Sequence, residues 1–294
     1  MATLAEYVKA PVVVRARQNP LLTLGLLLTV VPTMIALASR SWTSEAGVHG
    51  PLVLATAAWL VWRSWDEIVA EAERGAMAVA LPLLLLGSAV YAFSRAYNFL
   101  MTEVAGLLLA LLAIAYAFVG HRVLMRMWFP IVYLGFLIPL PGWAVDSLTQ
   151  PLKIFVSDAV TWILSLAGYP IAQQGVALYI AQYELLVEDA CAGLNSIVSL
   201  TAVGLFYIYL MHNASWKYSA ILFAFLLPIA VLANVIRVII LVLLTYYAGN
   251  EVAQGYLHDF AGIVTFVSAL LLVFLLDSIL TPLRNRIGNR RRQA

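Results

Sequence analysis

The chain has 294 residues, of which 63% are hydrophobic and 11% charged, and its formal net charge is +2. Soluble globular domains carry about 25% charged residues, so this composition excludes a soluble protein and predicts an all-α integral membrane protein. One cysteine excludes an internal disulfide framework and a multi-cysteine metal site, and four histidines without HExxH spacing predict neither a structural metal nor a cofactor.

Apolar runs long enough to cross a membrane, about 17–25 residues, recur along the whole chain. They cover residues 20–38, 49–65, 77–93, 103–120, 123–140, 191–211, 217–248 and 260–281. The sequence therefore predicts a polytopic protein with about eight transmembrane helices. Pro82 interrupts the third run and Pro130 the fifth, so the ends of these two helices are the least defined.

The distribution of Lys and Arg between loops predicts the orientation of these helices. With the N-terminus in the cytoplasm, thirteen Lys and Arg residues lie inside, and only Arg40, Arg95 and Lys153 lie outside. Both termini are therefore expected on the cytoplasmic side. Arg15 and Arg17 before the first run also fit a cleaved signal sequence, whose removal would not move any later loop.

Residues 141–190 form the only long non-spanning segment on the predicted outer side. After the helix-breaking Pro139-Leu140-Pro141-Gly142, apolar residues recur near helical spacing in 146–167, with Asp146, Gln150, Lys153 and Asp158 between them. This stretch predicts an amphipathic helix lying in the membrane interface. Alternating apolar residues from Gly175 to Val187 predict two short strands, a β-hairpin-like segment. Since no repeat or linker appears, residues 1–294 are expected to form a single membrane domain with 141–190 as an external insertion.

Cys191 lies in Glu188-Asp189-Ala190-Cys191-Ala192-Gly193-Leu194-Asn195-Ser196, where a polar segment enters the sixth apolar run. In the first turn of a helix the positive end of the helix dipole favours the thiolate, whereas the adjacent Glu188 and Asp189 oppose it. The sequence leaves two interpretations open, a reactive nucleophile or a small buried apolar side chain.

Apart from cations near the ends of the runs, Arg237 is the only formal positive charge inside an apolar run. Membrane-insertion scales assign a free-energy cost of about 2.5–3.5 kcal/mol to an arginine at the centre of a helix, so such an arginine usually has a partner or a function. At 1.5 Å per residue from Trp216, Arg237 lies roughly 31 Å along its helix, at the outer edge of the hydrocarbon core. It could instead snorkel to outer headgroups. Asn234, one turn earlier on the same face, either orients Arg237 or substrate, or packs against another helix.

His258 precedes the last apolar run, and helix parity places it on the same membrane face as Cys191 and Arg237. A thiol, a cation and an imidazole at one depth are the parts of an acyl-transfer site. Asp259 either orients His258 or is a solvated interfacial carboxylate.

Three blocks of sequence carry a resemblance to a known family. Ala190-Cys191-Ala192-Gly193-Leu194, Ala233-Asn234-Val235-Ile236-Arg237-Val238 and His258-Asp259-Phe260-Ala261-Gly262 resemble the signatures of the exosortase/archaeosortase family, within 139–265. One departure is Ala192, where the family commonly has serine. The resemblance implies Cys191 as nucleophile, Arg237 as the cation and His258 as the imidazole. Beside these three, we expect Asn195, Asn234 and Asp259 to bind substrate or support the site.

The family resemblance also implies an activity, a substrate and a location. It implies a cysteine protease or transpeptidase of the bacterial inner membrane that cleaves a PEP-CTERM-like C-terminal sorting signal, made of a short motif, an apolar helix and a basic tail. Partners would be exported precursor proteins, membrane lipids and an amine or lipid acceptor, in systems that accompany exopolysaccharide assembly, and not nucleic acid. A hydrolase without transfer, a transporter and a non-catalytic assembly protein are the alternatives.

The acidic loop with Asp66, Glu67, Glu71 and Glu73 is expected on the cytoplasmic side. It is either solvated or meets the basic tail of a substrate.

Overall fold

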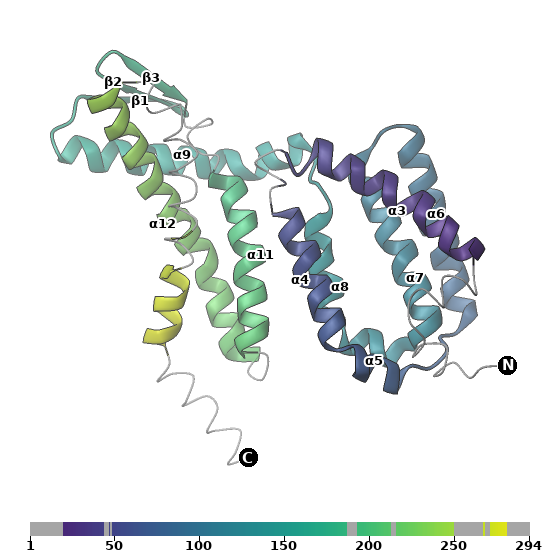
Figure 1. Ribbon diagram of the computed structural model, residues 1–294. Helices are drawn as coiled ribbons and strands as arrows, with labels where there is room; N and C mark the ends of the chain where they lie inside the picture. Colours follow the sequence, from purple (N-terminus) through teal and green to yellow (C-terminus); the bar gives the residue numbers. More distant parts are fainter. Residues whose placement is uncertain are drawn as a thin grey trace. The chain divides into compact units, whose positions relative to one another are not determined.

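The computed structural model describes residues 20–43, 47, 49–186, 193–212, 216–249, 267 and 271–280. The described part is mostly helical with one small sheet, as expected for a helical membrane protein. The chain divides into two compact units, Met1–Leu140 and Pro141–Ala294, which are described separately below. Figure 1 labels their helices and strands.

The first unit consists of helices. In chain order they are α3 (Pro20–Arg40), α4 (Gly50–Arg63), α5 (Trp65–Glu71), α6 (Met77–Ala96), α7 (Leu100–Arg126), α8 (Trp128–Tyr133) and the 3-10 helix η1 (Leu134–Leu137). The second unit contains α9 (Gly142–Leu166), β1 (Ile171–Gln174), β2 (Ala177–Ile180), β3 (Tyr183–Leu186), α11 (Gly193–His212), α12 (Trp216–Ala248) and a further helical stretch at 271–279.

Four helices of the described residues are long and apolar enough to cross a membrane. They comprise Thr23–Arg40 of α3, Met77–Ala96, Leu100–Arg126 and Tyr218–Ala248 of α12. The second predicted crossing corresponds to α4, which has 14 residues, and half of the eighth lies outside the described residues. Eight crossings therefore stay a prediction.

The fourth and fifth predicted helices have different boundaries in the structure, because α7 continues past Gly120 to Arg126. Gly120, at the predicted end of the fourth, has φ 78° and ψ 179°, so the helical geometry of α7 breaks there. A side chain would be strained at this φ, and a Cβ would approach the Glu73 carbonyl oxygen to 2.8 Å. The fifth run is not one helix, because it is shared between the end of α7, α8 and η1. Pro130 fits in the first turn of α8, where its missing N–H costs no helical hydrogen bond.

The α6–α7 hairpin is the closest helix pair in the first unit. A Cβ on Gly87 would lie 2.7 Å from the Ala110 nitrogen, and one on Gly106 would lie 2.6 Å from the Tyr91 nitrogen. The two backbones therefore touch directly. Small residues allow such contact in membranes, where packing rather than the hydrophobic effect holds helices together.

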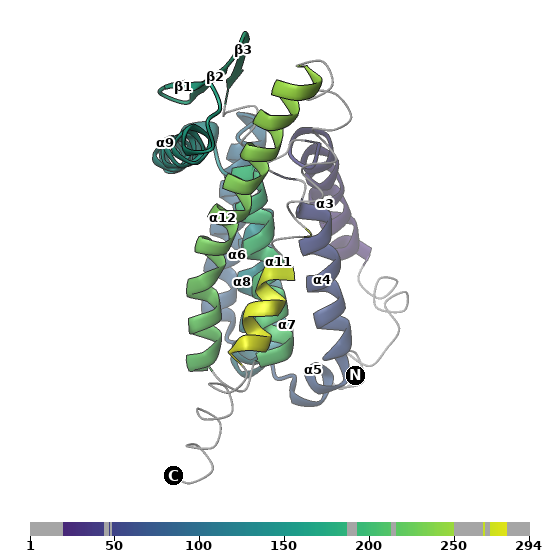
Figure 2. The same cartoon turned by 90° about the vertical axis from the view of Figure 1, so that its left-hand side faces the viewer.

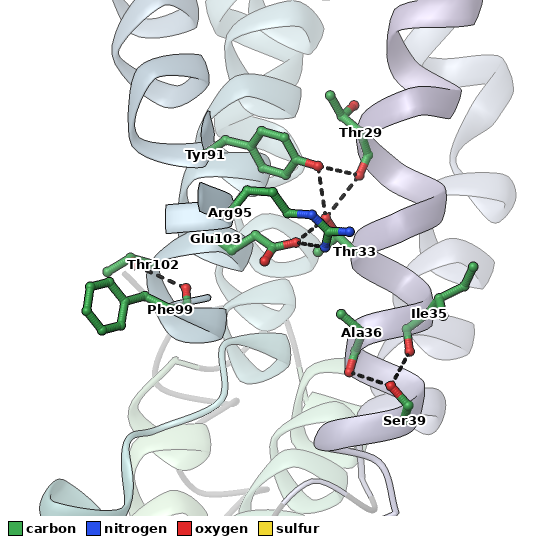
Figure 3. Close-up of polar contacts among 10 residues, drawn as sticks. All are labelled: Thr29, Thr33, Ile35, Ala36, Ser39, Tyr91, Arg95, Phe99, Thr102 and Glu103. Atoms are coloured by element: carbon green, nitrogen blue, oxygen red, sulfur yellow. Dashed lines mark hydrogen bonds and ion pairs between the residues drawn. The ribbon is translucent and has the colours of Figure 1, made fainter. Parts of the chain in front are cut away.

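A buried carboxylate joins α3 to this hairpin (Figure 3). Glu103 of α7 is 2% exposed, and its Oε1 accepts hydrogen bonds from Thr33 Oγ1 of α3 at 2.9 Å and from Arg95 of α6 at 2.8 Å. Tyr91 donates to the Thr29 carbonyl of α3 at 3.1 Å. Polar contacts of this kind hold α3, whose other side chains are largely exposed, to its neighbours.

The acidic loop is paired within the first unit. Arg126 of α7 forms ion pairs with Glu67, at 2.6 Å, and with Glu71, and Arg122 pairs with Glu73 at 3.0 Å. Three of the four acidic side chains thus have an intramolecular cation. This pairing favours a structural role for the loop over one in binding a basic tail.

In the second unit, α9 lies across α12, and α11 and α12 run side by side in opposite directions (Figures 1 and 2). The helix predicted at 146–167 is thereby confirmed. Its apolar side chains divide between two faces. Val156, Val160 and Leu164 are buried against α12 and the sheet, whereas Phe155 and Trp162 are exposed. The exposed aromatic face is the one that would contact lipid.

The sheet is antiparallel, with the order β1-β2-β3. The two predicted strands are confirmed as β2 and β3, and β1 adds a strand that the prediction lacked. Leu178, Ile180 and Leu185 point into the core formed with α9 and α12, while Glu184 on the other face is exposed. The sheet is therefore half-buried and rests on the same segment of α12 that α9 contacts.

Candidate functional site

Arg237 and Asn234 lie inside the second unit. Their exposed fractions are 3% and 2%, so protein encloses both side chains. Both residues make polar contacts, yet among the described residues Arg237 Nε and Asn234 Oδ1 are buried atoms without a hydrogen-bond partner of their own. A lipid-facing arginine would be exposed, so this burial supports an internal role over snorkelling.

The surroundings of Arg237 follow from the packing of α12. Val235, Val238, Leu241 and Val242 pack against α9 and the sheet. Arg237 and Asn234 are three residues apart and so share a side of the helix. The cation is therefore held on a rigid helix at the level where α9 crosses.

The register of α11 against α12 fixes what lies at the same level as Arg237. A Cβ on Gly204 of α11 would meet Leu226 Cδ2 of α12 at 2.6 Å, so these two positions are directly opposed. Eleven residues separate Gly193 from Gly204, and eleven separate Leu226 from Arg237. Because antiparallel helices rise equally per residue, Arg237 is level with Gly193, the first residue of α11.

Gly193 follows Cys191 by two residues in the chain. Cys191 itself, His258 and Asp259 lie outside the described residues, and Asn195 is described only as a backbone position in the first turn of α11. The structure thus describes two of the predicted site residues, Arg237 and Asn234, together with the start of the helix that Cys191 precedes.

A row of buried polar residues on α9 was missed by the sequence interpretation. Thr149, Lys153 and Ser157 recur every four residues on the buried face, and Lys153 is 7% exposed although it was predicted on the polar side. Ser157 Oγ donates to the Lys153 carbonyl at 2.9 Å. The spacing of the residues could have predicted this burial, because Lys153 is one helical turn before Val156 and Ser157 and so lies on the same face as the apolar Val156.

A buried carboxylate, Asp277 of the stretch 271–279, lies at the other end of α12. Asp277 accepts hydrogen bonds from the hydroxyls of Tyr207 at 2.5 Å and Tyr218 at 2.7 Å. These bonds join α11, α12 and the stretch 271–279. Tyr218 is nineteen residues before Arg237, about 28 Å along the helix, so this cluster is separate from the candidate site.

The sequence model of the transmembrane exosortase family matches residues 41–275. No curated protein and no solved structure shows a significant match to the chain. The matched range covers most of the chain, so the chain belongs to the transmembrane exosortase family, a family of membrane peptidases and transpeptidases. The resemblance found in the sequence is thereby confirmed.

Proposed function

We propose that this member of the transmembrane exosortase family is a cysteine transpeptidase. It cleaves a PEP-CTERM-like C-terminal sorting signal of exported proteins and transfers the new carboxyl end to an acceptor. The observation that supports this most is the buried Arg237, level with the start of the helix that Cys191 precedes. Acyl transfer through a thioester requires a fixed positive charge near the thiol, and Arg237 is level with Gly193, two residues after Cys191 in the chain.

In the first step the Cys191 thiolate attacks the carbonyl carbon of the scissile peptide bond. A carbon–sulfur bond forms, and the negative charge on the tetrahedral oxyanion is stabilised by the Arg237 guanidinium. The carbon–nitrogen bond then breaks, His258 gives a proton to the leaving amine, and a thioester remains. The arginine is effective because its burial removes competing water from the charge that develops.

In the second step His258 takes a proton from the acceptor, which attacks the thioester and releases the Cys191 thiolate. An amine or lipid acceptor yields a transferred product, whereas water yields a free carboxylate. The same residues serve both outcomes, so access of the acceptor to the thioester determines which product forms.

Three polar residues support these steps in the proposal. Asn234 is buried beside Arg237 on α12 and orients its guanidinium or the substrate. Asn195, in the first turn of α11, contributes its amide to substrate binding, and Asp259 orients the His258 ring. Such neighbouring contacts hold a reacting group in a productive geometry.

We place the protein in the bacterial inner membrane, with both termini in the cytoplasm and the site at the outer face. The Lys and Arg distribution between loops supports this orientation. A reporter fused after Ala294 should behave as cytoplasmic and one inserted near Gln173 as external, measured with a paired phosphatase and fluorescence assay. The opposite result at both positions would overturn the orientation.

The activity is tested by analysing the product of one precursor. The precursor is an exported protein of the same organism that ends in a short motif, an apolar helix and an Arg cluster, co-expressed with the enzyme. We expect a shortened protein whose new C-terminus, by mass spectrometry, carries an added acceptor. A free carboxylate would identify a hydrolase, and an unchanged precursor would overturn the proposed activity.

A further inference from the structure

β3 is an edge strand. In the part of the chain that the structure describes, it pairs with β2 alone, through Ala177↔Leu186, Leu178↔Leu185, Tyr179↔Glu184 and Ile180↔Tyr183. Its other side offers main-chain N–H and C=O groups to whatever lies there. An edge of this kind is where an extended peptide can add a further strand.

The register identifies which groups face outward. The loop between β2 and β3 has two residues, so the flanking pair Ile180 and Tyr183 exchanges its main-chain hydrogen bonds. Pairing then alternates along the strand. Tyr183 and Leu185 bond to β2, while the N–H and C=O groups of Glu184 and Leu186 point to the free edge. The Ala181 N–H donates to the Pro170 carbonyl, on the β1 side of β2, as this alternation requires.

β3 belongs to the same hydrophobic core as the segment of α12 that carries Arg237. The inner face of β3 packs through Leu185 into the core that contains Val235 and Val238 of α12, two residues before and one residue after Arg237. The strand ends at Leu186, five residues before Cys191 in the chain. Five residues span at most about 18 Å, and this length of chain is the upper limit on the separation of Leu186 and Cys191.

We propose that the free edge of β3 binds the substrate main chain as an added strand next to the scissile bond. This inference rests on the proposed function. A peptide whose carbonyl is attacked by a side chain has to be extended there, and in the membrane interface its unpaired main-chain groups are costly. The outward groups of Glu184 and Leu186 satisfy them and hold the peptide in register with the site.

The proposal explains how a short motif is selected in this enzyme. Main-chain pairing is independent of the side chains, and it turns alternate substrate residues toward the exposed face of the sheet, beside Tyr179 and Glu184. Tyr179 donates to the Glu184 carboxylate at 3.0 Å, so this face presents an ordered polar pair. Main-chain pairing with β3 would position the substrate, and contacts of its side chains with Tyr179 and Glu184 would add selectivity for the motif.

The test compares Glu184→Pro with Glu184→Ala. Proline removes the N–H that points to the free edge but no bond to β2, and proline is tolerated in edge strands at such positions. Alanine removes the same carboxylate and keeps the N–H. With the precursor used for the product analysis, we expect Glu184→Pro to lower kcat/KM by about 3- to 10-fold relative to Glu184→Ala, mainly through KM.

Two further measurements interpret the result. Leu185→Pro, which removes an N–H bonded to β2, should lower the amount of enzyme in the membrane, whereas Glu184→Pro should not. Equal kcat/KM for Glu184→Pro and Glu184→Ala would overturn the proposal. A Glu184→Pro variant that changes only the oligomeric state would also overturn it, because β3 would then pair with a second copy of the chain. An inactive wild-type enzyme would instead overturn the proposed function.

Discussion

Cys191→Ala should reach the membrane at the wild-type level and leave the precursor unprocessed, with a rate at least about a thousandfold lower than that of the wild type. Removing a covalent nucleophile costs orders of magnitude because the remaining groups can stabilise charge but cannot form the intermediate. The rate of precursor-to-product conversion is measured by immunoblot and normalised to enzyme in the membrane fraction.

Two neighbouring substitutions make this result specific. Cys191→Ser should also be severely impaired, since a serine hydroxyl is far less ionised than a thiol at neutral pH. Ala192→Ser places at that position the residue common in the family, and it should retain turnover within about threefold. Processing by Cys191→Ala near the wild-type rate would exclude the thioester and favour a non-catalytic assembly role.

The elements that the sequence predicts well are those whose signal is local. α12 matches the apolar run 217–248 within one residue, because an uninterrupted apolar stretch has no competing structure in a membrane. The fourth apolar run ends at Gly120, and the helical geometry of α7 breaks at the same residue because of its positive φ and the close Glu73 carbonyl. α9 was predicted from the change between apolar and polar residues.

The elements that the sequence does not reveal depend on contacts between distant residues. β1 has the sequence Ile-Ala-Gln-Gln, without an alternating apolar pattern, and it becomes a strand through pairing with β2. Glu103 is stabilised by Thr33, seventy residues earlier, and Asp277 by Tyr218, fifty-nine residues earlier. Neither partner could be identified from spacing along the chain.

In the candidate site, too, some features could be predicted from local sequence and others depend on contacts between distant residues. The helical rise predicts Arg237 near the outer end of its helix, and this stays a prediction. The opposed Gly204 and Leu226 put Arg237 level with the start of α11. Its burial could not be predicted, since the α9 residues that cover this segment belong to a helix that the sequence assigned only to the interface. The assignments of Cys191 and His258 stay predictions.

Arg237→Lys tests whether the site needs the guanidinium group to bind the oxyanion or only a positive charge at this position. A guanidinium is a planar fork with fixed donors, whereas an ammonium is a compact charge on a flexible stem. Losing one preorganised donor to an oxyanion costs about 10²–10³ in rate. Arg237→Lys should therefore be inserted normally but turn over precursor at least about tenfold more slowly, and Arg237→Ala should be close to inactive.

Arg95→Lys is the matched control, because Arg95 is also on the predicted outer side but its side chain is 44% exposed and its known contact is the ion pair with Glu103. Lysine keeps that charge, so turnover should stay within about twofold of the wild type. The rate is the conversion of precursor per enzyme in the membrane at saturating precursor, which reports the chemical step if product release is fast. Near-normal turnover of Arg237→Lys, with Arg237→Ala impaired, would show that the site needs a buried positive charge rather than a guanidinium. The oxyanion would then have to be stabilised by a different donor.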